Sequence, residues 1–370
     1  MPPIAPSARC LLGPGPSNAN PRVLAAMSRP LLGHLDPEFL AEVDEVQERL
    51  RRVLGTSNPM TLPLSCTGSG GMEACLANLL EPGDDAVVGV AGVFGERMCE
   101  VASRVGARVH RVDAAWGRVL DPDAVREAIR RVHPRVVAFV HAETSTGAWQ
   151  PVDEIAAAAR EAGALVVLDC VTSLAGVPVT LDEWGIDAAY SGTQKCLSCP
   201  PGLSPASFSA RAVERVKART KKVQSWYLDV SLLSAYYGTE RVYHHTAPIS
   251  AIFGLAEALR IVEEEGLEAR FARHRRAAER LVAGLVPLGF EPLVAEAHRL
   301  PMLSSLRLPP RVLAAGEASV RKRLLDRHGI EVGAGLGPLA GTIWRVGLMG
   351  ENARESVADR LVEALARELA

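Results

Sequence analysis

The chain has 370 residues, a formal net charge of −2 and a hydrophobic fraction of 48%, which describe an ordinary globular protein of about two or three compact units. The near-zero charge and the lack of a basic stripe argue against nucleic acid as a partner. No apolar run approaches the roughly 18 to 20 residues that span a bilayer, and the first thirty residues lack a secretory pattern, so we expect a cytoplasmic protein with no membrane partner.

The first predicted segment is an arm. The arm covers residues 1–22, and its stretch LLGPGPSNANP is dense in glycine, proline and asparagine, so this stretch is predicted to form turns rather than helix or strand. Apolar residues then recur at steps of three and four from residue 37 to residue 54, which predicts an amphipathic helix.

A long α/β section follows, in which short apolar runs without polar alternation are separated by helical patterns. Such strands indicate a mainly parallel, seven-stranded sheet covered on both faces. The expected strands are TLPLSC, AVVGV, ARVHRV, RVVAFVH, ALVVLDC, DAAYSG and ASFSA. The expected helices are 71–80, 94–104, 121–131 and 153–162. With the bridging stretch 212–265, which holds the aromatic cluster Trp226, Tyr227, Tyr236, Tyr237 and Tyr243, this section forms a predicted large unit over residues 23–265.

The last part of the chain predicts a smaller α+β unit over residues 266–370, with its own layers. Its expected elements are helix 267–287, strand 303–308, helix 316–328, strand 342–348 and helix 353–369.

The seven cysteines are odd in number and stop at Cys199, which fits reduced thiols better than a disulfide framework. Cys196 and Cys199 form a lone CxxC motif. A zinc site would need a second pair of ligands and a redox site would need a thioredoxin-like setting, so we expect packed thiols and no metal.

Polar residues at the strand ends carry the chemistry, because parallel sheets bind ligands beyond the carboxyl ends of their strands. A glycine-rich turn begins at Thr67 and suits an anion, and Asp169 ends the run GALVVLD. Lys195 is one of only five lysines in a chain that uses arginine for most basic positions. Unlike arginine, lysine can lose its proton and form a Schiff base.

Together these residues suit pyridoxal phosphate, which needs an anion cradle, an amine and a carboxylate for its pyridine nitrogen. Arg345 lies inside the apolar strand GTIWRVGLMG, where its charge needs an anion or carbonyl groups. Its planar guanidinium would bind a substrate carboxylate, although an ion pair between the two units is the alternative.

Several segments together resemble the class V aminotransferase family, in its alanine–glyoxylate and serine–glyoxylate (serine–pyruvate) group. These segments are LLGPGPSN, TGSGGMEA, LEPGD, ETSTG, LDCVTSLAG, YSGTQKCLSCPPG, YHHTAPIS and RVGLMG. The resemblance implies the type I fold of pyridoxal phosphate enzymes. It also implies ping-pong transamination, by way of pyridoxamine phosphate, between alanine or serine and glyoxylate or pyruvate.

The resemblance also implies a role for each matching residue. Lys195 would form the Schiff base and move the proton at the substrate α-carbon, while Asp169 would pair with the pyridine nitrogen. Phe94 would stack on the ring and Thr144 would lie near its phenolic oxygen. The phosphate would be held by Thr67, Gly68, Ser69 and Gln194.

The substrate carboxylate would be bound by Arg345, with the backbone at Gly15 and Gly33 closing a small pocket and His34 as a candidate for substrate selectivity. A homodimer with shared sites is implied as well, because Tyr243 and Thr246 match positions that reach the phosphate in the neighbouring subunit.

Three alternatives stay open. Kynurenine transaminases share the same motifs, so a larger aromatic donor is possible. A cysteine desulfurase-like lyase is disfavoured because such enzymes need a cysteine nucleophile far downstream, and no cysteine follows Cys199. A catalytically silent binding protein would be expected to lose Lys195, Asp169 or Arg345, and all three are present.

Overall fold

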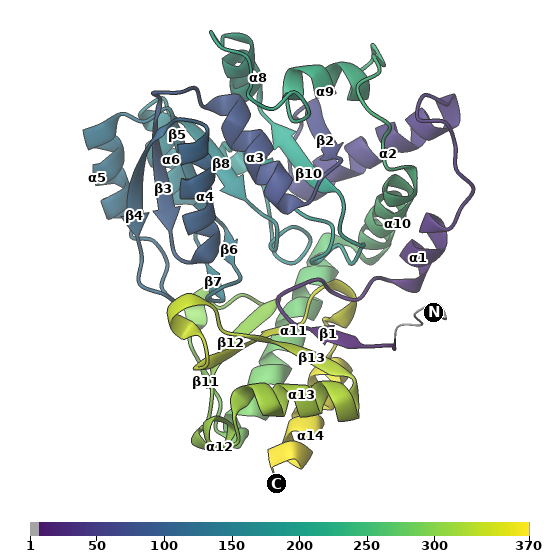
Figure 1. Ribbon diagram of the computed structural model, residues 1–370, viewed down its shortest axis with the longest axis vertical. Coiled ribbons are helices and arrows are strands. Elements are labelled where there is room, and N and C mark those ends of the chain that lie inside the picture. Colours follow the sequence, from purple (N-terminus) through teal and green to yellow (C-terminus); the bar gives the residue numbers. More distant parts are fainter. Residues whose placement is uncertain (1–6, 370) are drawn as a thin grey trace.

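The larger of the two main sheets forms the upper part of the molecule in Figure 1, and the computed structural model describes residues 7–369. Its strand order is β2-β10-β9-β8-β5-β3-β4. The strands are β2 (Met60–Leu64), β3 (Asp85–Val90), β4 (Arg108–Asp113), β5 (Val136–Val140), β8 (Leu165–Asp169), β9 (Ala188–Tyr190) and β10 (Ser204–Phe208). Strand β10 runs antiparallel to β2 and β9, and the other pairs are parallel. The predicted mainly parallel, seven-stranded sheet is confirmed.

Helices cover this sheet because its central strands are largely apolar. Every residue of β5 and β8 is buried. The helices between the strands are α3 (Gly68–Leu79), α4 (Val93–Arg104), α5 (Pro122–Val132), α6 (Asp153–Glu161) and the short α7 (Leu181–Trp184). A two-stranded hairpin, β6 (Ala142–Glu143) with β7 (Ala148–Trp149), extends from the end of β5.

Helix α2 (Pro37–Leu54) begins and ends where the sequence predicts. Asp36 caps its first turn by accepting a hydrogen bond from the Glu38 N–H, and Pro37 suits the first helical position. Gly55 ends the helix with a left-handed conformation, at a φ of 58°.

The smaller sheet lies below the larger one in Figure 1 and has the order β1-β13-β14-β12-β11. Its strands are β1 (Cys10–Leu12), β11 (Glu291–Pro292), β12 (Leu303–Arg307), β13 (Ile330–Ala334) and β14 (Ile343–Gly347). The helices of this region are α11 (Leu267–Leu285), α12 (Pro310–Ala314), α13 (Glu317–His328) and α14 (Glu355–Leu369). A second apolar core, which includes Leu12 and Trp344, lies between them. Four 3₁₀ turns occur among the described residues, at Val286–Leu288, Glu296–His298, Gly337–Leu339 and Gly350–Asn352.

Residues 1–6 of the predicted N-terminal arm lie outside the described residues, and for residues 7–22 the prediction that the arm lacks helix and strand is wrong. Strand β1 pairs in parallel with β13, and helix α1 (Pro21–Met27) packs against the later helix α10 (Ile249–Glu265). Pairing with a distant strand satisfies the backbone groups of three residues, Cys10–Leu12, that directly precede the turn-rich segment GPGPSN. The bridging stretch also contains α8 (Ala210–Lys217) and α9 (Val230–Tyr237) ahead of α10.

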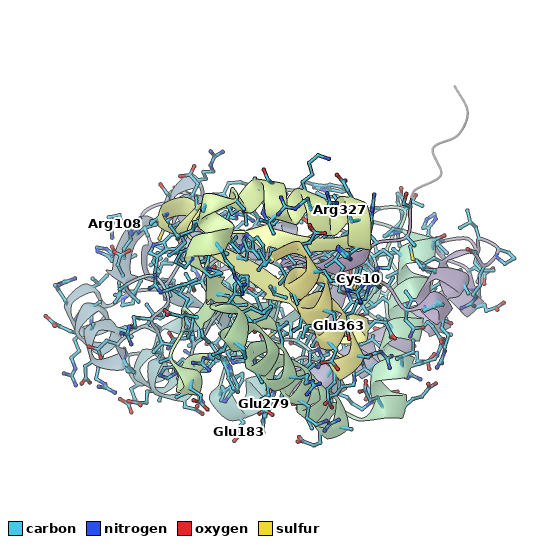
Figure 2. All side chains as sticks on the ribbon, turned by 90° about the horizontal axis from the view of Figure 1, so that it is seen from below. Cys10, Arg108, Glu183, Glu279, Arg327 and Glu363 are labelled. Atoms are coloured by element: carbon cyan, nitrogen blue, oxygen red, sulfur yellow. The ribbon has the colours of Figure 1, made fainter. Side chains whose placement is uncertain are left out.

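Charges of both signs spread over the surface in Figure 2, where Arg327 on α13 and Glu363 on α14 mark the small-sheet side. Each of the seven cysteines is a free thiol, and both members of the CxxC motif are buried. Within residues 7–369, no helix is long and apolar enough to cross a membrane, and no group of three or more metal-ligating side chains gathers.

Candidate active site

A cavity of about 200 Å³ opens beyond the carboxyl ends of the central strands. Eight of the predicted cofactor residues line it: Thr67, Gly68, Ser69, Phe94, Thr144, Asp169, Gln194 and Lys195. A larger groove of about 770 Å³ lies beside the edge strand β2, between α2, α8 and α9. We place the candidate site in the smaller cavity, because it is the one of the two that joins a lysine, a buried carboxylate and the start of a helix.

Lys195 follows β9 by a short loop and reaches the cavity with a side chain that is almost fully buried. Its amine donates a hydrogen bond to the carbonyl oxygen of Pro14 in the N-terminal arm. Burial lowers the pKa of this amine to about 8, and the charge of Arg345 acts in the same direction, while Asp169 opposes it. A large share of the amine is therefore neutral at slightly alkaline pH, as a nucleophilic lysine requires.

Asp169 ends β8 and is held by two hydrogen bonds. Its Oδ1 accepts from the Val171 N–H at 2.8 Å, and its Oδ2 accepts from the Tyr190 hydroxyl at 2.8 Å. Burial raises the pKa of the carboxyl to about 6, and the charge of Glu143 adds to the rise, while the two hydrogen bonds and Lys195 oppose it. The carboxyl is ionised at neutral pH and can pair with a cationic ring nitrogen.

The start of α3 lines one end of the cavity and could hold an anion there. Its N-cap residue, Thr67, makes no side-chain capping hydrogen bond, so backbone N–H groups of the first turn stay available. The Oε1 atom of Gln194 is buried and lacks a hydrogen-bond partner among the described residues. An incoming group with hydroxyl or protonated phosphate oxygens would satisfy it.

Arg97 is a cavity residue that the sequence analysis missed. It lies on α4, one turn after Phe94, and its guanidinium carbon is 4.9 Å from the centroid of the Phe94 ring. Its Nη1 donates to the Oγ of Ser69 at 3.2 Å. Among the residues that line the cavity, Arg97 and Lys195 are the two cations. Arg97 follows Phe94 by three residues on the same helix, a spacing that places both side chains on one face and could have predicted that Arg97 reaches the cavity.

Glu143 positions Phe94, a role that the motif ETSTG does not reveal. Its buried carboxylate accepts from the Phe94 N–H at 3.1 Å, and Ser145 Oγ accepts from the Val93 N–H at 3.0 Å. These two side chains cap α4 in place of Gly92, which has no side chain to offer. A β-carbon at Gly92 would lie 2.7 Å from the carboxyl carbon of Glu143, so glycine is needed for this approach.

Arg345 lies at the centre of β14 and is buried. Its Nε donates to the Ala334 carbonyl at 2.7 Å and its Nη1 donates to the Thr144 carbonyl at 3.2 Å. Burial lowers the pKa of the guanidinium and the charge of Glu143 raises it. Within residues 7–369, the hydrogen bonds of Arg345 go to carbonyl oxygens and no ion pair holds it, so the alternative of a structural salt bridge between the units is not what the structure shows.

Gly15 contacts Lys195 and Arg345 contacts Thr144, although neither lines the cavity, and four further predicted site residues lie away from it. The ring of His34 is 5.1 Å from the ring of Tyr243, whose side chain is 59% exposed, and Gly33 and Thr246 are also exposed. Large apolar side chains surround them on the surface: Leu31, Leu35, Trp226 and Val242. The chain thus presents an exposed apolar patch next to residues that its own cavity does not use.

The sequence of the chain matches the family model described as aminotransferase class-V over residues 11–358. The chain belongs to the class V aminotransferase family. Members of this family use pyridoxal phosphate. The chain is therefore a pyridoxal phosphate-dependent aminotransferase, as its motifs predicted.

Relatives and solved structures agree with this placement. The chain is 39% identical to the (S)-ureidoglycine–glyoxylate transaminase of Bacillus subtilis, over 94% of this chain and 87% of the relative. It is also 39% identical to the alanine–glyoxylate aminotransferase of Drosophila melanogaster, over 98% and 93%. The crystal structure of the alanine–glyoxylate aminotransferase of Nostoc sp. has a TM-score of 0.97 at 49% identity, over 100% of this chain and 97% of that one.

The desulfurase alternative shares only the fold. A cysteine desulfurase structure from Thermococcus onnurineus superimposes with a TM-score of 0.78 at 15% identity. No cysteine of this chain follows Cys199 in the sequence, so none occupies the late position that a desulfurase nucleophile would need.

Proposed function

We propose that the chain transfers the amino group of a small amino acid, alanine or serine, to glyoxylate or pyruvate in a ping-pong reaction. The observation that carries the proposal is Arg345, a buried guanidinium that donates to the carbonyl of the cavity residue Thr144 and has no anionic partner among the described residues. Both relatives described above bear names with glyoxylate as acceptor, and one bears a name with alanine as donor. These names support a small oxo acid as the second substrate.

The residues of the cavity fit pyridoxal phosphate. The cavity is lined by a buried amine with a lowered pKa, a buried carboxylate and the uncapped start of α3. The unpartnered Oε1 atom of Gln194 marks a place for a further polar group. When bound, the cofactor supplies an aldehyde that condenses with amines and a ring that accepts electrons from the substrate α-carbon.

Lys195 would hold the cofactor's aldehyde carbon until an amino acid displaces it. Its freed amine would then take the proton from the substrate α-carbon and deliver it to the carbon of the cofactor. Because burial lowers the pKa of this amine to about 8, a large share of it would be unprotonated at slightly alkaline pH, as the first of these steps requires. Asp169 would keep the ring nitrogen protonated, and Phe94 would stack on the ring.

The phosphate would lie at the start of α3, with the backbone and side chains of the first turn, the Gln194 amide and the Arg97 guanidinium around it. Thr144 would face the phenolic oxygen of the ring. Arg345 would bind the substrate carboxylate, and Gly15 would close the pocket from the arm. The other assignments rest on the residue's place at the cavity or on its contact with Lys195, and that of Arg345 rests on its hydrogen bond to the carbonyl of Thr144, which lines the cavity.

We also propose a homodimer with shared sites. Tyr243 and Thr246 would reach the phosphate in the partner's site, and Gly33 and His34 would close its substrate pocket. The exposed apolar patch around these residues supports this proposal, because burying it would remove several large side chains from water. Mixing Tyr243→Phe chains with Lys195→Ala chains should restore part of the activity in hybrid dimers, and no recovery would contradict shared sites.

A panel of donor half-reactions tests the substrate. Alanine, serine, (S)-ureidoglycine and kynurenine would each be added to the holoenzyme while the visible absorption of the lysine-bound cofactor is followed. We expect alanine or serine to remove this band, and glyoxylate to restore it. Bleaching by kynurenine alone would overturn the small-donor proposal. Transamination by Lys195→Ala at the wild-type rate would overturn the mechanism itself.

(S)-Ureidoglycine is the second candidate donor. The structure of the ureidoglycine–glyoxylate aminotransferase of Bacillus subtilis superimposes with a TM-score of 0.96 at 38% identity, over 99% of this chain and 94% of that one. Faster bleaching by ureidoglycine than by alanine or serine in the same panel would favour it.

A further inference from the structure

Tyr190 makes a contact with Asp169 that the proposed mechanism has not used. It is the last residue of β9, its side chain is fully buried, and it lines the cavity. Strands β8 and β9 run in parallel and place Asp169 opposite Tyr190 in the register. The Tyr190 hydroxyl donates to Asp169 Oδ2 at 2.8 Å, so two adjacent strand ends are joined through their side chains.

This hydrogen bond and the one from the Val171 N–H engage both oxygens of the carboxylate. Two donors on opposite oxygens prevent free rotation of the group and stabilise its ionised form. A buried tyrosine hydroxyl needs a partner, and Asp169 is the acceptor that the structure provides. The pair is therefore a fixed unit at the floor of the cavity.

Few other groups act on this carboxyl. Glu143 on β6 raises its pKa and Lys195 lowers it, but burial is the largest cause of its upward shift. The neighbouring thiols of Cys75 on α3 and Cys170 after β8 have pKa values raised by burial, so they remain neutral near pH 7. The hydrogen bond from Tyr190 is thus one of the few contacts that oppose protonation of Asp169.

We propose that Tyr190 is a positioning residue, which orients the ionised Asp169 carboxylate and weakens it as a base, so that the proton shared with the cofactor stays on the ring nitrogen. The inference rests on the proposed pairing of Asp169 with that nitrogen. A carboxylate that already accepts a hydrogen bond attracts a second proton less strongly. Without the hydroxyl, the proton moves toward Asp169 and the ring becomes a poorer acceptor of electrons.

The test uses holoenzyme loaded with pyridoxal phosphate that carries ¹⁵N at the ring nitrogen. The ¹⁵N chemical shift reports directly whether this nitrogen is protonated, independently of turnover. We expect the Tyr190→Phe variant to shift the signal toward the unprotonated value, and to lower the midpoint of its pH titration by about one unit, the typical effect of one hydrogen bond to a charged group. Binding of the cofactor by the apoenzyme should weaken by about tenfold.

Tyr237→Phe is the matched control. Tyr237 is also buried, and its hydroxyl donates to the Pro63 carbonyl at 3.2 Å rather than to a site residue. This variant loses the same atom from a buried tyrosine and should keep the wild-type ¹⁵N signal. If Tyr190→Phe does not fold, 3-fluorotyrosine at position 190 retains the hydroxyl and makes it a stronger donor, and we then expect a higher titration midpoint.

The outcomes separate this inference from the proposed function. A wild-type ¹⁵N signal and midpoint in Tyr190→Phe would overturn the role of Tyr190, and so would equal effects of Tyr190→Phe and Tyr237→Phe. The Asp169→Asn variant tests the underlying pairing, because its ring nitrogen should be unprotonated at neutral pH. A protonated nitrogen in Asp169→Asn would overturn the pairing of Asp169 itself.

Discussion

Gly15 of the N-terminal arm leaves the space that the amine of Lys195 occupies. A β-carbon at residue 15 would lie 2.7 Å from Cδ and 2.8 Å from Cε of the lysine, and closer still to Nζ. Gly15 also has a φ of +109°, a conformation that side chains of L-amino acids disfavour. The arm therefore shapes the lysine's surroundings through the absence of a side chain.

Gly15→Ala should weaken cofactor binding by at least about tenfold, because the methyl group must displace Lys195 and the backbone strain adds about 1–3 kcal/mol. The measurement is a titration of the apoenzyme with pyridoxal phosphate, followed by its visible absorption. Gly13→Ala is the control, since a β-carbon there would meet no atom closer than 3.7 Å. Equal affinity of the two variants would contradict the steric argument.

Arg345→Gln should raise the KM for both the amino acid and the oxo acid by roughly 10- to 100-fold, the loss expected for hydrogen bonds between charged groups. Cofactor affinity should stay near the wild-type value, because Arg345 is assigned to the substrate. Steady-state kinetics and a cofactor titration separate the two effects. Arg307→Gln, an exposed change on the adjacent strand β12, should leave both unchanged. Loss of cofactor affinity in Arg345→Gln would instead point to a structural role.

Arg97→Gln should weaken the binding of pyridoxal phosphate by about tenfold, because it removes a cation beside Ser69 at the phosphate end of the cavity. Pyridoxal, which lacks the phosphate, should bind equally to the variant and the wild type. If Arg97 only supported the ring of Phe94, both ligands would bind more weakly. Arg104→Gln, an exposed change on the same helix, serves as the control.

Asp169→Asn should stabilise the apoprotein at neutral pH. Burial raises the pKa of this carboxyl from 3.8 to about 6, so its contribution to stability is present at low pH and is lost as the pH rises through 6. The variant should exceed the wild type by up to about 3 kcal/mol in the free energy of unfolding at pH 7.5, with little difference at pH 4.

Urea unfolding at the two pH values, at one protein concentration, measures this difference. Asp182→Asn provides a contrast of opposite sign. Hydrogen bonds from Thr56 and Ser57 lower the pKa of Asp182 although burial raises it, so its ionised form favours folding at neutral pH. Equal stability of wild type and Asp169→Asn at pH 7.5 would show that the folded protein holds the ionised carboxylate without cost.

The central sheet could be predicted because its strands are short apolar runs between helices of clear periodicity. Helix α10 was not predicted, since its buried residues, from Ile249 to Val262, are apolar around most of the helix and give little amphipathic contrast. Strand β1 has only three residues, and its partner β13 lies near the other end of the sequence. Local patterns carry no information about such a pairing.

The same limit applies to the candidate site. The sequence points to Lys195, Asp169 and Arg345 because a charged residue at the end of an apolar strand, or inside one, requires a compensating partner or a functional role. Glu143 and Tyr190 act on other side chains, through hydrogen bonds that form only when loops from different parts of the chain meet. Arg97 looked like an ordinary surface arginine on a helix, and the fold alone brings it to Ser69.

The pairing of β1 with β13 has a consequence for how the protein is made. During synthesis from the N-terminus, β1 leaves the ribosome first among the described strands, while β13 is among the last. The arm that carries Gly15 must wait, unpaired, until most of the chain exists. The wall of Lys195's pocket should therefore form late in folding, and the nascent chain should be unable to bind its cofactor stably until the small sheet closes.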